Sequence, residues 1–238
     1  MLPSNYKIFE MNQSVKNLEN AHQAFRVGRL SDAEEICREI LGNDEQCAGA
    51  WHLMGKMAAL QSDLEAAGEF SSAACDLDPQ NAEFTRDFSE VFLRKKELEP
   101  AEQHARRALE LLPESPEGIV LLARILAEKE EKSAALEAFQ EAIRIRKDYA
   151  EGLSYYALAL QKFGRGKDAI SQIRKACALE SDSVEFQTNL AILLEQNARY
   201  MDSLAAYGKA GRMNPNVGFV WFRQGKLLNG LKRYAESI

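Results

Sequence analysis

The chain repeats one 34-residue pattern of small and large side chains along most of its length. Steps of 34 residues from Ala157 meet only small residues: Ala21, Gly55, Ser89, Ala123, Ala191 and Gly225. The same steps from Ala169 meet Ala33, Ala67, Ala101, Ala135, Ser203 and Ser237. A fixed period of this length indicates stacked supersecondary units, each of which needs its neighbours to bury its apolar face.

Residues 150–183 show what one unit contains. Apolar side chains recur at helical spacing in both halves: Leu153, Tyr156, Ala157 and Leu160, then Ala169, Ile170, Ile173 and Ala176. Such spacing predicts two amphipathic helices. Between them, Gly164 and Gly166 suit a tight turn because glycine tolerates positive φ. The unit is therefore predicted to be a helix–turn–helix hairpin.

Counted from Ser14, the repeat divides the chain without insertions. Six full units run 14–47, 48–81, 82–115, 116–149, 150–183 and 184–217. Residues 1–13 form an N-terminal lead, and 218–238 a partial seventh unit that we expect to be truncated. A turn before Tyr234 is predicted to start its short second helix. Trp221 and Leu228 are expected to lack part of their cover.

The second unit carries the residues that make a family resemblance visible. The unit has a large apolar residue early in its sequence, small residues where its two helices would cross, and a closing proline. The matching residues are Trp51, Met54, Gly55, Ala58, Ala67, Ala74 and Pro79. On these residues the chain resembles the tetratricopeptide repeat family. The resemblance covers residues 14–238 and implies an all-α, right-handed superhelix of helix–turn–helix repeats, which acts mostly as a binding scaffold.

Composition limits the partners and the compartment. The chain is 46% apolar and 28% charged, typical of an ordered globular protein, with a net charge of −6 that argues against nucleic-acid binding. Residues 184–238 are the exception, with a net charge of +3. No apolar run is long enough for a membrane span, and the first residues do not form a signal peptide. Four cysteines without a Cys-x-x-Cys pair suit a reducing cytoplasm.

No residues form a recognisable catalytic, cofactor or metal motif. His22 and His52 are predicted to approach each other as polar residues, with no cysteine or carboxylate beside them at ligand spacing. His104 is predicted to lie on a solvated face, and Cys37 in the core. Phosphate-binding, dinucleotide-binding, zinc-protease and hydrolase motifs are all missing from the sequence. We therefore expect no catalytic residues, cofactor or metal, and no enzymatic activity.

The resemblance places the binding residues in a concave groove lined by the first helix of each repeat. Mapped onto this sequence, the predicted peptide-binding groove contains Arg124, Tyr155, Asn189, Phe222, Arg223 and Lys226. Cationic and amide donors beside aromatic rings suit an extended peptide with an acidic side chain or C-terminus. A solvated face without a ligand is the alternative interpretation of the same residues.

Three functional hypotheses remain open from the sequence. The first is a protein–protein interaction scaffold that binds a partner protein or peptide in the groove. The second is a substrate-recruiting arm of a larger bacterial sulfotransferase or glycosyltransferase, whose catalytic domain would lie beyond residue 238. The third is self-association through the uncovered seventh unit.

Overall fold

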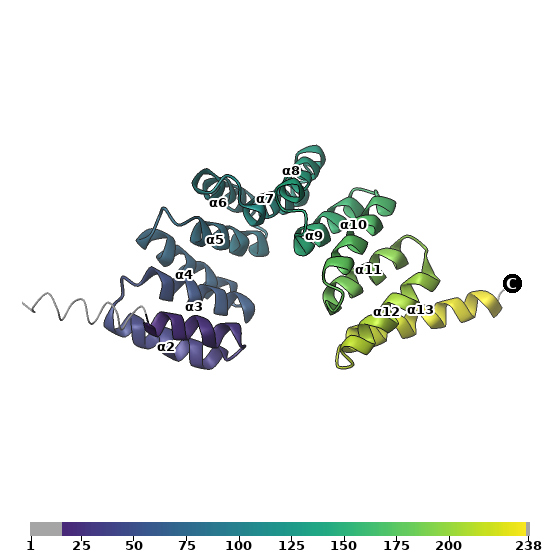
Figure 1. The fold of residues 1–238 in the computed structure, drawn as a ribbon, viewed down its shortest axis with the longest axis horizontal. Helices are drawn as coiled ribbons and strands as arrows, with labels where there is room; N and C mark the ends of the chain where they lie inside the picture. The colour runs from purple at the N-terminus through teal and green to yellow at the C-terminus, as the bar shows by residue number, and fades with distance from the viewer. Residues whose placement is uncertain (1–15, 237–238) are drawn as a thin grey trace, which may run out of the picture. The chain divides into compact units, whose positions relative to one another are not determined.

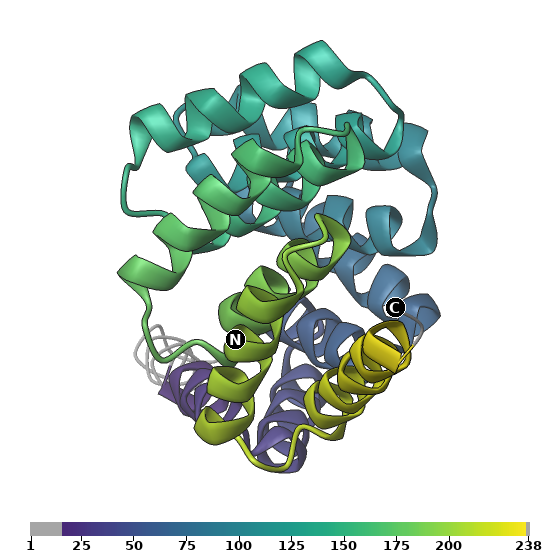
Figure 2. The same ribbon diagram turned by 90° about the vertical axis from the view of Figure 1, so that its right-hand side faces the viewer.

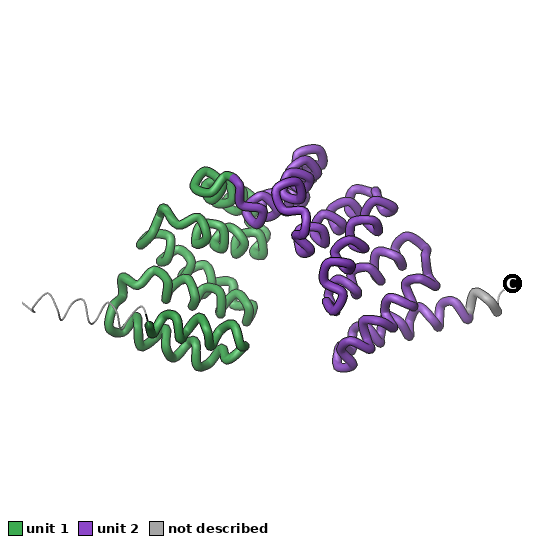
Figure 3. The backbone as a smooth tube through the Cα atoms, viewed as in Figure 1, with its two compact units in different colours: residues 1–113 green, residues 114–238 purple. Residues whose placement is uncertain are grey.

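The computed structural model describes residues 16–236, and side chains for residues 16–232, as an array of α-helices without strands (Figure 1). The residues 1–13 predicted as a lead lie outside the described range. The chain divides into two compact units, Met1–Pro113 and Glu114–Ile238, called unit 1 and unit 2 below (Figure 3). The predicted all-α repeat fold is confirmed for the described residues.

The helices pair into antiparallel hairpins within each unit (Figures 1 and 2). Unit 1 contains a helical segment over 16–26, then α2 (Leu30–Asn43), α3 (Ala48–Leu60), α4 (Leu64–Leu77), α5 (Ala82–Lys95) and α6 (Leu98–Leu111). Unit 2 contains α7 (Pro116–Glu128), α8 (Lys132–Ile145), α9 (Ala150–Lys162), α10 (Gly166–Leu179), α11 (Val184–Gln196), α12 (Tyr200–Met213) and α13 (Gly218–Glu236). We call α3, α5, α7, α9, α11 and α13 the first helices, and the even-numbered ones the second helices.

The turns inside the hairpins follow the repeat as closely as the helices do. Residues with left-handed φ occur every 34 residues: Gly28, Ser62, Lys96, Glu130, Gly164 and Ala198. After each of them, the next backbone N–H donates to the carbonyl five residues earlier, as Arg165 does to Leu160 at 2.8 Å. This is the Schellman arrangement that ends a helix. Four of the six positions are not glycine, so packing of the hairpin outweighs a local strain of about 1–2 kcal/mol.

The small residues of the repeat lie where the two helices of a hairpin cross. Ala157 on α9 and Ala169 on α10 are both fully buried. Two hairpins add a hydrogen bond at the crossing: Ser89 donates to the carbonyl of Ala101, and Ser203 to that of Ala191. The small side chains therefore set how closely the two backbones approach, as the sequence predicts.

The seventh repeat differs from the prediction. Helix α13 runs without interruption from Gly218 to Glu236, so the expected turn before Tyr234 is wrong. Lys232, one 34-residue step after Ala198, lies inside this helix. At the equivalent positions of the earlier repeats, the left-handed turn lies between two helices that pack against each other. As expected, Trp221 and Leu228 are each 43% exposed.

Helix α13 should exchange its amide hydrogens faster than the other first helices of unit 2. It packs against α12 and reaches α11 through the Arg223–Glu195 ion pair, whereas α9 packs against α7, α8, α10 and α11. Helices with few packed neighbours open with a smaller free energy. Hydrogen exchange followed by mass spectrometry should show residues 218–230 deuterated before residues 150–162. Equal protection in a monomeric sample would contradict this expectation.

None of the helices described, over residues 16–236, combines the length and the apolar character that crossing a membrane requires.

Candidate functional site

Two pairs of consecutive first helices touch through polar side chains at equivalent repeat positions. Nε2 of His52 on α3 lies 2.9 Å from Oδ2 of Asp87 on α5, 35 residues later. Asn189 on α11 donates to Oγ of Ser154 on α9 at 3.2 Å, again 35 residues apart. The two pairs are separated by three repeat steps, so they occupy equivalent places in units 1 and 2. The stacking of repeats thus brings particular side chains together at intervals fixed by the sequence.

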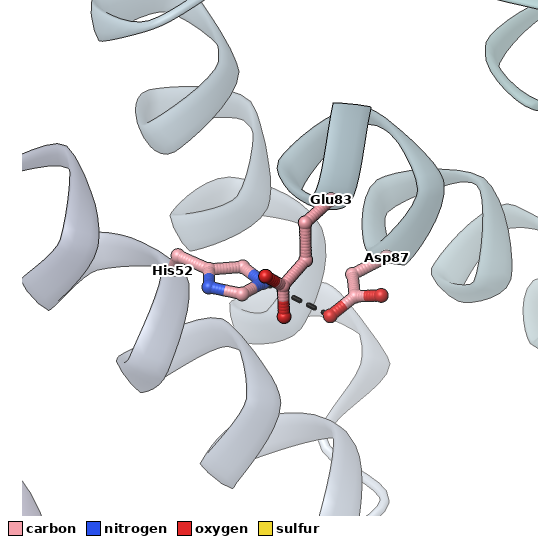
Figure 4. Close-up of side chains that lie close together, drawn as sticks. All are labelled: His52, Glu83 and Asp87. Atoms are coloured by element: carbon pink, nitrogen blue, oxygen red, sulfur yellow. Dashed lines mark hydrogen bonds and ion pairs between the residues drawn. The ribbon is translucent and has the colours of Figure 1, made fainter. Parts of the chain in front are cut away.

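In unit 1 this contact belongs to a larger charged cluster, of which Figure 4 shows His52, Glu83 and Asp87. Ligand-type atoms of His52, Glu83 and Asp87 lie within 4.8 Å of one another. Nζ of Lys56 is 3.5 Å from both Oε1 of Glu83 and Oδ2 of Asp87. Arg86 contacts the other oxygen of Asp87, with Nη2 at 2.6 Å from Oδ1. We call these five residues the unit 1 cluster.

Burial and charge decide the protonation of Asp87. Burial alone would raise its pKa, but the hydrogen bond from His52 and the positive charges of Arg86 and Lys56 outweigh that effect. The pKa of Asp87 consequently falls to about 2. The His52 side chain is only 4% exposed, and its ring lies 4.4 Å from that of Phe84. The imidazole is therefore held in place by the ring of Phe84 as well as by the carboxylate of Asp87.

Two of the predictions about histidines are wrong. The sequence predicts no carboxylate beside His52, but the next repeat supplies Glu83 and Asp87, which spacing within one helix does not reveal. His104 does not lie on a solvated face: its ring stacks on that of Phe92, with centroids 5.3 Å apart, and contacts the tilted ring of Phe88 at 4.7 Å, and burial lowers its pKa. Cys37 is fully buried, as predicted, and burial raises the pKa of its thiol to about 12.

In unit 2 the accessible side of the first helices carries the predicted binding residues. On α9 the residues left accessible include Glu151, Tyr155, Leu158 and Lys162, which recur at one-face helical spacing. Leu158 is 39% exposed although it is large and apolar. The accessible residues at equivalent repeat positions on α7, α11 and α13 complete this surface, which we call the unit 2 face: Glu117, Arg124, Glu128, Glu185, Asn189, Ile192, Gln196, Phe219, Arg223, Lys226 and Gly230. Leu121, which is equivalent to Tyr155, is buried.

Three of the predicted binding residues make contacts between neighbouring first helices. The guanidinium carbon of Arg124 lies 4.2 Å from the centre of the Tyr155 ring, a cation–π contact between α7 and α9. Asn189 is oriented by its hydrogen bond to Ser154 on α9. Arg124, Tyr155 and Asn189 thus lie on three helices, α7, α9 and α11, which contact each other in succession.

Arg223 has a different environment from the one predicted. Its guanidinium pairs with Glu195 at 3.0 Å, and its Nε lies 3.4 Å from the hydroxyl of Tyr207. Tyr207 in turn donates to the same carboxylate oxygen of Glu195 at 2.9 Å. Side-chain exposure is 27% for Arg223 and 23% for Glu195. The predicted donor is therefore part of a half-buried network that connects α11, α12 and α13.

The other two predicted residues on α13 are exposed. Phe222 is 68% exposed, and Lys226 is also on the accessible surface. The repeat position of Phe222 is occupied in unit 1 by His52, whose side chain is covered by α5. The exposure of Phe222 follows from the absence of a corresponding helix beside α13 among the described residues.

Three comparisons place the chain among known proteins. Family models described as tetratricopeptide repeat match residues 18–82 and residues 116–149. No curated protein sequence matches the chain. Among solved structures, a chain of the APC/C hetero-tetramer Cut9–Hcn1 is 15% identical with a TM-score of 0.76, over 90% of this chain and 42% of that chain. The present chain thus spans less than half of that relative.

Two shorter structures resemble the chain over nearly their whole length. TTC0263, a thermophilic TPR protein of Thermus thermophilus, is 22% identical with a TM-score of 0.71, over 76% of this chain and 99% of that one. YrrB, a TPR protein with an unusual peptide-binding site, is 17% identical with a TM-score of 0.51, over 79% and 97%. Identities this low establish the fold and carry no information about ligands. The repeat models show that the chain contains tetratricopeptide repeats at residues 18–82 and 116–149, and the structural similarity extends the same helical-repeat fold over most of the chain.

Proposed function

We propose that this chain is a protein-interaction scaffold that holds a partner peptide against the unit 2 face. The observation that carries the proposal is the exposure of Leu158 beside the Arg124–Tyr155 stack and the oriented amide of Asn189. An exposed aliphatic side chain on the same face as an aromatic ring and a hydrogen-bonding amide offers both the apolar contact and the backbone recognition that an extended peptide needs.

Each predicted residue has a role in this proposal. Tyr155 supplies apolar contact within the unit 2 face, Phe222 supplies it from α13 beside that face, and Asn189 binds the peptide backbone through its carboxamide. Arg124 and Lys226 supply positive charge for an acidic partner, in line with the net +3 of residues 184–238. Arg223 contributes less directly, because its guanidinium already pairs with Glu195 and holds α13 against α11.

The fold neighbours favour the same class of function. The peptide-binding site named for YrrB is a property of that protein, and here it shows only that a related array can bind a peptide. An arm that recruits substrates for a larger transferase would use the same face, so the identity of the captured partner distinguishes it from a free-standing scaffold. Self-association through α13 would use Phe222 and leave Tyr155 uninvolved.

Lys226→Glu should weaken the binding of an acidic peptide by about tenfold or more, equivalent to about 1.4 kcal/mol. The peptide is selected from a display library on the tag-free chain, and its affinity is measured by isothermal titration calorimetry. Higher salt should also weaken the wild-type complex, because the contact is exposed. Lys226 is accessible, so the substitution leaves the fold intact.

The matched control is Lys175→Glu, which makes the same charge change on the exposed side of α10. Tyr155→Ala tests the apolar part of the face in the same titration. If both Lys226→Glu and Tyr155→Ala bind the peptide like the wild type, the unit 2 face is not the binding surface.

A further inference from the structure

We propose that His52, Glu83 and Asp87 form a site for a divalent transition-metal ion that links α3 to α5. The three side chains come from successive first helices, and one ligand atom from each lies within 4.8 Å of the other two. An ion with bonds of about 2.0–2.2 Å to nitrogen and oxygen needs its ligands somewhat closer together. The Glu83 side chain can supply the movement because it is 54% exposed.

The place between the two carboxylates already attracts a cation. The ammonium of Lys56 lies 3.5 Å from Glu83 and 3.5 Å from Asp87. A bound metal ion would displace this ammonium, whose side chain is 34% exposed and long enough to move into solvent. Metal and Lys56 are therefore competitors for the same negative charge, and Lys56 sets how tightly the ion binds.

The remaining contacts orient the ligands. Arg86 binds Oδ1 of Asp87 and leaves Oδ2 directed at His52. The ring of Phe84, with its centre 4.4 Å from that of His52, fixes the plane of the imidazole. Supporting contacts of this kind are typical of protein metal sites, where they set ligand orientation. A metal ion at Nε2 of His52 would require the neutral imidazole with its proton on Nδ1.

The ligand set selects the class of ion. One imidazole nitrogen with two carboxylate oxygens suits Zn²⁺, Co²⁺ or Ni²⁺, whereas Mg²⁺ and Ca²⁺ prefer oxygen alone. Water molecules would complete the coordination. The equivalent residues of unit 2 are Ser154, Glu185 and Asn189, which hold one carboxylate and no imidazole. Unit 2 is thus an internal comparison in which the same fold lacks the ligand set.

Zinc should bind the tag-free full chain with one ion at the cluster and raise its melting temperature, because a ligand that binds only the folded state stabilises it. Isothermal titration calorimetry gives the stoichiometry, and the visible absorption of bound Co²⁺ reports the ligand environment. Glu83→Gln should weaken zinc binding by about a hundredfold or more, since loss of a direct ligand exceeds the effect of a supporting contact. Circular dichroism should show its fold unchanged.

Lys56→Met separates this proposal from adventitious binding by surface histidines. Removal of the competing ammonium should tighten zinc binding by about tenfold, whereas Lys56→Arg, which keeps the charge, should bring no such gain. His104→Gln removes a histidine outside the cluster and should leave the affinity unchanged. Absence of saturable zinc binding, or equal binding by wild type, Glu83→Gln and Lys56→Met, would overturn the proposal.

Discussion

Ala157→Leu should lower the stability of the array by about 1–3 kcal/mol, because the close contact between the two helices at this position leaves no room for a leucine side chain. Ala157 is fully buried on α9, against α10. For a chain of this size, each kcal/mol corresponds to a fall of about 2–4 °C in melting temperature. Thermal unfolding followed by circular dichroism measures the change directly.

Ala134→Leu is the matched control for that experiment. Ala134 is exposed on α8, outside the repeated small positions, so its replacement should change the stability by no more than about 0.5 kcal/mol. The two variants have the same change in side-chain volume and apolar character. Equal melting temperatures for the two would mean that the crossing does not lie at Ala157.

Asp87→Asn should remove about 2 kcal/mol of stability at neutral pH. Although burial opposes the charge, His52, Arg86 and Lys56 stabilise it and lower the pKa of this carboxyl group from 3.8 to about 2. A depressed carboxyl pKa contributes stability that is fully present above the unfolded pKa and is lost as the pH falls through the folded pKa. The difference between wild type and variant should therefore be constant above pH ~5, and should shrink between pH ~4 and pH ~2.

Urea unfolding in metal-free buffer measures this difference in the free energy of unfolding. The measurement is repeated from pH ~7 down to the lowest pH at which both proteins are still folded. Metal is excluded so that the charge of Asp87 is tested apart from the proposed ion. Glu137→Gln, an exposed carboxylate on α8, is the control and should follow the wild type at each pH. A wild-type advantage that persists unchanged to pH ~2 would show that the Asp87 charge is not its source.

Several parts of the fold follow from the sequence because they are local. Helix periodicity and the small residues at 34-residue intervals fix where hairpins form and which alanines are buried, as Ala157 and Ala169 show. Glycine also marks the turns at Gly28 and Gly164. The same signal is missing at Ser62 and Lys96, which adopt the same left-handed φ. Only the packing of two helices makes that conformation favourable there.

The partners of the polar side chains required the tertiary structure. The sequence predicts Arg223 on an open groove, yet it pairs with Glu195, which is 28 residues earlier in the chain. It also predicts His52 without a carboxylate, because the ligand-type oxygens belong to the following repeat. Such pairs depend on the register between stacked helices and on side-chain rotamers, and neither is encoded in the period of one helix.

At the two candidate sites, too, the sequence determined some features and the tertiary structure decided others. The repeat determined which residues of α7, α9 and α11 share an accessible face, since side chains at fixed repeat positions lie on the same side of every first helix. The tertiary structure decided that Arg124 stacks on Tyr155 and that Lys56 lies between Glu83 and Asp87. The physical reason is that periodicity specifies direction along one helix, whereas contacts between helices depend on distances that only close packing sets.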